Sequence, residues 1–65
     1  MLFNTIYIAL NNNYMTIGTQ VVFLNDTDER FGTIEYINGN RVHICGLDGS
    51  LYITNVQSIL YPLFI

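Results

Sequence analysis

Short turn signals recur at nearly even intervals along this chain and limit each structural element to a few residues. They fall at Gly18, Asn25-Asp26, Asn38-Gly39, Asp48-Gly49 and Asn55. Between them lie segments rich in β-branched and aromatic residues, at 19–24, 31–37, 41–46 and 51–54. No stretch repeats its apolar residues with the 3.6-residue period of a helix. The pattern predicts an all-β chain of short strands, with one helical turn near residues 55–58.

The length of each hairpin loop decides which side chains point inward. The even-numbered apolar positions of 34–36 and 42–44 form the natural inward face of two strands, and they align only across a loop of odd length. We expect a three-residue loop at 37–39, with Gly39 in the left-handed conformation of a G1 bulge. This register pairs Ile34 with Val42 and Glu35 with Arg41.

The next hairpin requires a loop of even length, because Leu51 and Ile53 must join the same inward face. Asp48-Gly49 as a two-residue type I′ turn meets this requirement and places Ile44 opposite Ile53. The two hairpins therefore agree on one inward set: Val21, Phe23, Ile34, Tyr36, Val42, Ile44, Leu51 and Ile53.

The same register turns a group of polar and aromatic side chains outward, and we expect an interaction surface there. Its members are Glu35, Arg41, His43, Cys45 and Tyr52. His43 and Cys45 are residue types that serve as base and nucleophile, and they lie two residues apart. No motif for an oxyanion-binding loop or an orienting carboxylate accompanies them, so the chain is not expected to be an enzyme.

The charge and the cysteine content limit the kinds of binding partner and the cellular compartment that we expect. The chain has five acidic side chains, two arginines and no lysine, which gives a net charge of −3. Non-specific nucleic-acid binding draws its affinity from Lys and Arg, so nucleic acid is an unlikely partner and a basic protein suits better. A single cysteine, Cys45, allows no internal disulfide, and a reducing cytoplasm is the expected location.

No metal or cofactor is expected. One histidine and one cysteine fall short of any zinc-ligand spacing. The segment 25–30 begins with alternating oxygen ligands, as a calcium loop does, but it lacks the glycine and the distal bidentate glutamate of an EF-hand. We expect it to be a solvated loop between two strands.

The first residues of the chain predict an N-terminal accessory strand. Residues 1–10 carry no charge, and their apolar positions alternate with period two. We therefore divide the chain into a β arm with an Asn-rich linker, 1–14, and a barrel, 15–65. The arm is expected to add a strand to a second copy or to a partner, through Phe3, Ile6, Tyr7 and Ile8. The alternatives are that it folds back on its own barrel or that it is not translated, with Met15 as the start.

The segments 17–23, 31–34, 42–44 and 59–62, joined by the acidic loop and the two Gly-containing turns, follow a recognisable order. The chain from Ile17 to Pro62 resembles SH3-like small β-barrels of the KOW and Tudor kind. The resemblance implies a five-stranded barrel with a short helical turn before the last strand. KOW-type RNA binders are basic and this chain is not. The aromatic cage of methyl-lysine Tudor domains would have these candidates here: Phe23, Phe31, Tyr36 and Tyr52.

Small size, acidic balance and exposed aromatic residues favour a non-enzymatic protein-binding domain. Abundant Phe, Tyr, Ile and Asn point to an AT-rich genome, and we expect a small viral or phage accessory protein that binds and modulates a host protein. The basic groove of a host defence nuclease is a target that an acidic binder would suit. Two alternatives stay open: a KOW- or Tudor-like reader of nucleic acid or modified peptides, and a self-assembling structural subunit.

Overall fold

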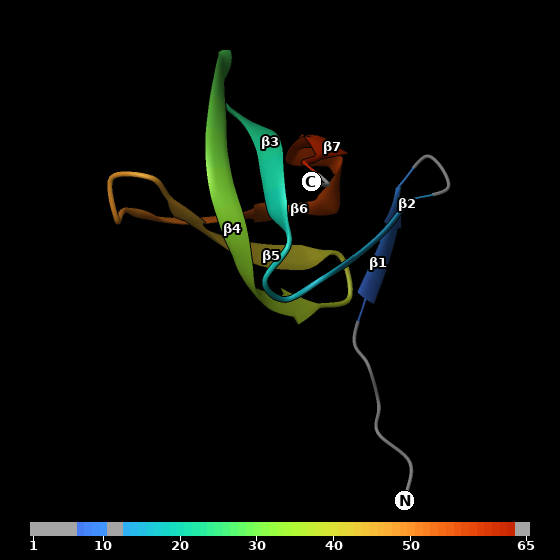
Figure 1. Cartoon of the computed structure of the whole chain (residues 1–65). Coiled ribbons are helices and arrows are strands. Elements are labelled where there is room, and N and C mark those ends of the chain that lie inside the picture. Colours follow the sequence, from blue (N-terminus) through green and yellow to red (C-terminus); the bar gives the residue numbers. More distant parts are fainter. Residues whose placement is uncertain (1–6, 11–12, 64–65) are drawn as a thin grey trace, which may run out of the picture.

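Antiparallel strands make up most of the chain that the computed structural model describes, which is residues 7–10 and 13–63 (Figure 1). The all-β prediction is confirmed. The elements in chain order are β1 (Tyr7–Leu10), β2 (Asn13–Thr16), β3 (Gln20–Asn25), β4 (Asp28–Asn38), β5 (Arg41–Gly46), β6 (Leu51–Asn55), the 3-10 turn η1 (Val56–Ser58) and β7 (Ile59–Pro62).

Five strands form one sheet in the order β6-β5-β4-β3-β7, and every neighbouring pair is antiparallel. The sheet is not closed into a barrel, which corrects the expected closure: in the described residues β6 pairs only with β5, and β7 pairs only with β3. The predicted helical turn before the last strand is present as η1, although the Asn55 side chain makes no capping hydrogen bond. Because η1 replaces a hairpin turn, the chain passes from one edge of the sheet to the other without pairing β6 with β7.

The β4–β5 hairpin has a different register from the predicted one. Its turn is the two-residue loop Gly39-Asn40, with Asn38 opposite Arg41 and Gly39 at φ +60°. The positive φ at Gly39 is confirmed, whereas the three-residue loop and the Glu35–Arg41 pairing are wrong. The extra residue that was expected in the loop is found instead in β4, as a β-bulge at Glu35. Ile34 consequently lies opposite Ile44.

The β5–β6 loop also differs from the prediction. Gly49 N–H donates to the Gly46 carbonyl (3.0 Å) and Gly46 N–H donates to the Ser50 carbonyl (2.8 Å), which closes a three-residue loop with Gly49 at φ +84°. Asp48 does not have the positive φ that a type I′ turn requires. Because this loop has an odd number of residues, the side chains of β6 point to the opposite faces from those predicted. The three-residue loop thus belongs to the β5–β6 hairpin and the two-residue turn to the β4–β5 hairpin.

The core confirms five of the eight predicted inward residues and corrects three. Val21, Phe23, Ile34, Val42 and Ile44 are at most 1% exposed. Tyr36, Leu51 and Ile53 are 41%, 56% and 56% exposed, because the bulge and the three-residue loop turn them outward. Further apolar side chains that the prediction did not include are also buried: Met15, Val22, Ile37 and Ile59.

The turn between β3 and β4 is tighter than predicted. Asn25 pairs with Asp28, so only Asp26 and Thr27 lie in the turn, and Asp26 has φ +57°. Asn and Asp are the non-glycine residues that tolerate this left-handed region best. Most of the expected solvated loop 25–30 is therefore strand.

At the N-terminal side, β1 and β2 form a separate two-stranded sheet beside the larger one (Figure 1). Met15 of β2 is fully buried in the core of the larger sheet. β2 thus spans both sides of the expected boundary between residues 14 and 15. The expected linker lies partly outside the described residues, at 11 and 12.

The reversed faces of β6 yield a stability prediction. Ile44→Ala should lower the free energy of unfolding by about 2–5 kcal/mol, because it opens a cavity in the core. Ile53→Ala, the same truncation on the neighbouring strand at an exposed position, should cost about 1 kcal/mol or less. Urea denaturation of both variants measures the difference. An Ile53→Ala variant as unstable as Ile44→Ala would contradict the observed β6 register.

Candidate functional site

Aromatic and apolar side chains gather on the sheet surface opposite the core, across β4, β5 and β6. Tyr36, His43 and Ile53 are cross-strand neighbours in one row, and Cys45 and Leu51 are neighbours in the next. Directly opposite residues in an antiparallel sheet point to the same face. We call this surface the outer face and define it by five residues: Tyr36, His43, Cys45, Leu51 and Ile53.

The Tyr36 and His43 rings anchor the outer face. Their centroids are 4.5 Å apart with an interplanar angle of 38°. His43 is half-buried, and its Nε2 atom is buried with no hydrogen-bond partner in the described part of the chain. Since Nε2 has no hydrogen-bond partner, ring packing and not a polar contact holds His43 against Tyr36. Leaving a buried polar atom unsatisfied costs about 1–3 kcal/mol.

Cys45 and His43 have separate environments on this face. The Cys45 thiol donates to the Gly46 carbonyl (3.6 Å), and Leu51 lies opposite it on β6. His43 instead packs against Tyr36. The geometry gives neither residue the base–nucleophile contact that a catalytic pair needs.

The other predicted surface residues are divided between two faces. Glu35 is exposed at the bulge, and Arg41 is exposed beside the Gly39-Asn40 turn, opposite Asn38 rather than Glu35. Tyr52 was expected to point outward, and this is wrong, because the three-residue β5–β6 loop turns it inward. Its ring packs edge-on against Phe23, with centroids 5.1 Å apart. The interaction role of these residues stays a prediction.

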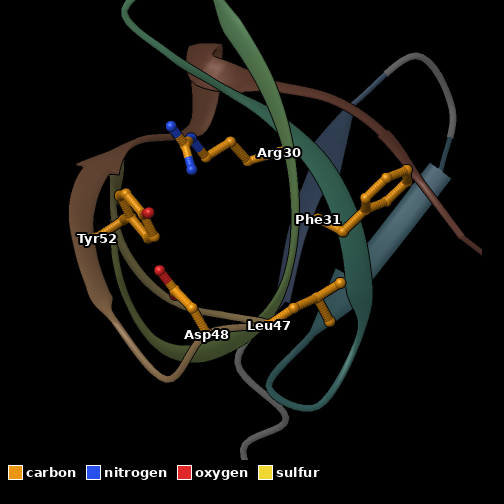
Figure 2. A pocket seen from close by; sticks show the side chains of 5 residues that line it. All are labelled: Arg30, Phe31, Leu47, Asp48 and Tyr52. Atoms are coloured by element: carbon orange, nitrogen blue, oxygen red, sulfur yellow. The ribbon is translucent and has the colours of Figure 1, made fainter.

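Tyr52 also lines a small pocket of about 190 Å³ between β4 and the β5–β6 loop, with Arg30, Phe31, Leu47 and Asp48. Figure 2 shows the polar ends of Arg30, Asp48 and Tyr52 directed toward one space, while the Phe31 ring points away. Sequence reasoning did not single out Arg30, Leu47 and Asp48 as a group. The sequence offered one signal for this pocket: Leu47 is an apolar residue inside an otherwise polar turn, between Gly46 and Asp48. In the structure Leu47 is 80% exposed on the loop.

Asp48 is held in its loop by Ser50. One carboxylate oxygen accepts from the Ser50 backbone N–H (2.9 Å) and the other from the Ser50 hydroxyl (3.1 Å). The backbone N–H bond, then the hydroxyl bond, lowers the pKa of the Asp48 carboxyl, and the charge of Arg30 adds in the same direction. The Asp48 carboxyl therefore keeps its negative charge under mildly acidic conditions, beside the positive charge of Arg30.

The residues predicted to support oligomerisation are only partly described. Phe3 and Ile6 lie outside the described residues. Tyr7 and Ile8 belong to β1, where their backbones pair with Thr16 and Met15 of β2. Within this chain β1 thus has a partner strand in β2, and association of the arm with a second copy stays a prediction.

The Asp48–Ser50 contacts predict a pH effect. Because the folded-state pKa of Asp48 is lowered, the loop stabilisation is complete above the ordinary carboxyl pKa of about 3.9 and is lost as pH falls through the folded-state value. Ser50→Ala should raise the Asp48 pKa toward the ordinary value, as followed by carboxyl ¹³C NMR. Ser58→Ala, which removes a hydroxyl elsewhere, should leave it unchanged. An Asp48 carboxyl that titrates at the ordinary value in the unsubstituted protein would contradict the geometry.

The described residues offer neither a metal cluster nor a helix that could span a membrane. Among residues 7–10 and 13–63, no three His, Cys, Asp or Glu side chains lie close enough together to hold a metal ion. The described part of the chain has no helix of the length and apolar character needed to cross a membrane. The chain matches no protein-family model, no curated protein and no solved structure.

Proposed function

We propose that the chain is a non-enzymatic protein-binding domain that uses its outer face to contact a larger protein. The biological setting that we propose is a small cytoplasmic accessory protein of a virus or phage, which binds and modulates a host protein. A basic surface, such as the groove of a host defence nuclease, is the kind of target that suits a chain with a net charge of −3.

The exposure of the outer face is the observation that carries this proposal. Tyr36, Leu51 and Ile53 are 41–56% exposed on this face: Leu51 and Ile53 lie two residues apart on β6, and half-buried His43 of β5 lies between Ile53 and Tyr36 of β4. Contiguous exposed apolar surface on a small chain marks a site of association more often than scattered single residues do. Aromatic side chains such as Tyr36 are enriched in the energetically important centres of protein interfaces.

We also propose that the sheet is an open form of an SH3-like small β-barrel, with β1 as an accessory strand. The order of elements supports this: a first strand after Gly18, two tight hairpins, a 3-10 turn and a short last strand. The pairing of the first and last of these strands, β3 and β7, supports it as well. The outer-face residues lie on the β4–β5 and β5–β6 hairpins.

The two alternative functions make different demands on the molecule. A Tudor-like aromatic cage needs several rings around one space, whereas Phe23 lies in the core with Tyr52 packed against it, and Tyr36 packs against His43 on the opposite face. A nucleic-acid reader would have only Arg30 and Arg41 for phosphate contacts. Self-assembly would need an exposed sheet edge, and in the described residues β6 and β7 are the edge strands of the main sheet.

The outer face can be tested with matched pairs of serine substitutions. Leu51→Ser/Ile53→Ser removes apolar surface from the outer face, and Ile17→Ser/Leu47→Ser removes comparable exposed surface elsewhere. A protein captured from lysates of candidate host cells should still bind the Ile17→Ser/Leu47→Ser variant. It should bind the Leu51→Ser/Ile53→Ser variant at least tenfold more weakly, which is a loss of about 1.4 kcal/mol of binding free energy. Titration calorimetry with the purified partner measures this ratio, after circular dichroism shows both variants folded.

Three results would contradict the proposal. Equal binding by both variants would remove the outer face from the interaction. A stable homo-oligomer with no other partner in sedimentation would favour self-assembly. Submicromolar, sequence-independent binding of duplex DNA or RNA at about 150 mM salt would favour the nucleic-acid reader.

A further inference from the structure

The strand β6 presents an unpaired hydrogen-bonding edge. In the described residues it pairs only with β5. Gly46 N–H donates to the Ser50 carbonyl at one end, and Val56 N–H donates to the Asn40 carbonyl at the other. Hydrogen-bonded and non-hydrogen-bonded pairs alternate along an antiparallel ladder, so Tyr52 and Thr54 use their backbone groups toward β5. The N–H and C=O groups of Leu51, Ile53 and Asn55 therefore point away from the sheet.

A groove runs along this edge where the sheet fails to close. It has a volume of about 510 Å³ and is lined on one side by 51–54 of β6 and on the other by 23–26 of β3 and its turn, with Gln57 and Ser58 of η1 completing it. The pairing between β3 and β7 ends at Phe23, which lies opposite Ile59. The backbone of Leu24 and Asn25 therefore faces the groove without β7 beside it. We call this space the edge groove.

Charged side chains, proline and a bulge, which often protect an edge strand, are missing from β6. Its sequence, Leu51–Asn55, contains no lysine, no proline and no charged residue, and its pairing with β5 shows no bulge. Natural proteins normally use such devices to prevent another strand from adding to an edge. An uncharged edge beside an open groove is the arrangement that strand addition requires.

Charge decides which strand would fit. Asp26 lines the edge groove, and Asp28 and Glu29 follow it at the start of β4. Arg30 forms an ion pair with Asp28 (3.5 Å), and Arg41 lies opposite Asn55 at the far end of β6. A second copy of this chain carries the same net charge of −3 and would be repelled, whereas a basic segment would be attracted.

We propose that an extended, positively charged segment of a partner protein adds to the β6 edge as a further strand of the sheet, with a Lys or Arg side chain beside Asp26. The main-chain groups of Leu51, Ile53 and Asn55 supply the hydrogen bonds, and Asp26 supplies the charge preference. This inference rests on the proposed protein-binding function, but it uses the outward backbone groups of β6 and the Asp26 carboxylate, whereas the outer face uses side chains. Leu51 and Ile53 belong to both, because they also line the edge groove.

A model peptide tests the edge directly. The probe is a blocked octapeptide of alternating Lys and Val, titrated into the full chain and followed by ¹H–¹⁵N NMR. The amide signals of Leu51, Ile53 and Asn55 should shift most, and their hydrogen exchange should slow. A peptide of alternating Glu and Val should bind at least tenfold more weakly. Asp26→Asn should weaken binding of the Lys-Val peptide severalfold and reduce its dependence on salt.

Two substitutions at one position separate the edge from the outer face. Ile53→Pro removes an outward N–H, at an edge where proline does not break the ladder with β5, and should weaken peptide binding at least tenfold. Ile53→Ser keeps the N–H and removes only the apolar side chain, so it should weaken peptide binding far less than Ile53→Pro does. If the outer-face variant loses its protein partner but still binds the peptide, both proposals stand. If it keeps the partner, the proposed function fails by itself.

Several results would overturn the edge proposal. They are failure of the Lys-Val peptide to bind at millimolar concentration, equal binding of the Glu-Val peptide, and equal binding by Ile53→Pro. If Ile53→Pro does not fold, a Lys-Val peptide methylated on every backbone amide decides the matter, because it cannot form the ladder and should not bind. Pairing of β6 with β6 of a second copy in the absence of peptide, seen as a dimer in sedimentation, would also reject the basic segment as the occupant.

Discussion

The β-bulge at Glu35 is the constraint on which the rest of the sheet depends. β4 is the longest strand, and it has to bury Ile34 and Ile37 on the same face although they are three residues apart. A regular strand cannot do this, because successive side chains alternate between faces. One extra residue at Glu35 resets the alternation, so that Ile34 faces Ile44 and Ile37 faces Val42.

The bulge also determines what the two surfaces of the sheet can do. It moves Tyr36 out of the core and places it beside His43, which creates the aromatic part of the outer face. On the inward side, Gly32 allows β4 to approach closely: a Cβ at this position would lie 2.7 Å from the Cys45 carbonyl oxygen. The close approach at Gly32 and the bulge at Glu35 together shape β4, which bridges β3 and β5, while the sheet stays open between β6 and β7.

Much of this architecture could be predicted from the sequence, because turn residues and β-branched segments are local signals. They located the strands of the main sheet, the turn at Gly39 and the 3-10 turn before the last strand. Loop length was not fixed by local chemistry: Gly39 and Gly49 both adopt positive φ, and each suits a two- or a three-residue loop. The two hairpins exchange the loop lengths that were expected of them, and this reversed Leu51, Tyr52 and Ile53. Ile37, an apolar residue directly before a turn, was the signal for the bulge. The edge groove depends on how far β7 follows β3, which no local pattern encodes.

Cross-strand nuclear Overhauser effects between β4 and β5 test the central claim most directly, because each register brings different backbone protons together. The bulged register predicts contacts between Ile34 and Ile44 and between Ile37 and Val42. Contacts joining Ile34 to Val42 and Glu35 to Arg41 would indicate a regular β4 with Tyr36 inside. That result would contradict the outer face, the assignment of the core and the bulged register of β4 with β5.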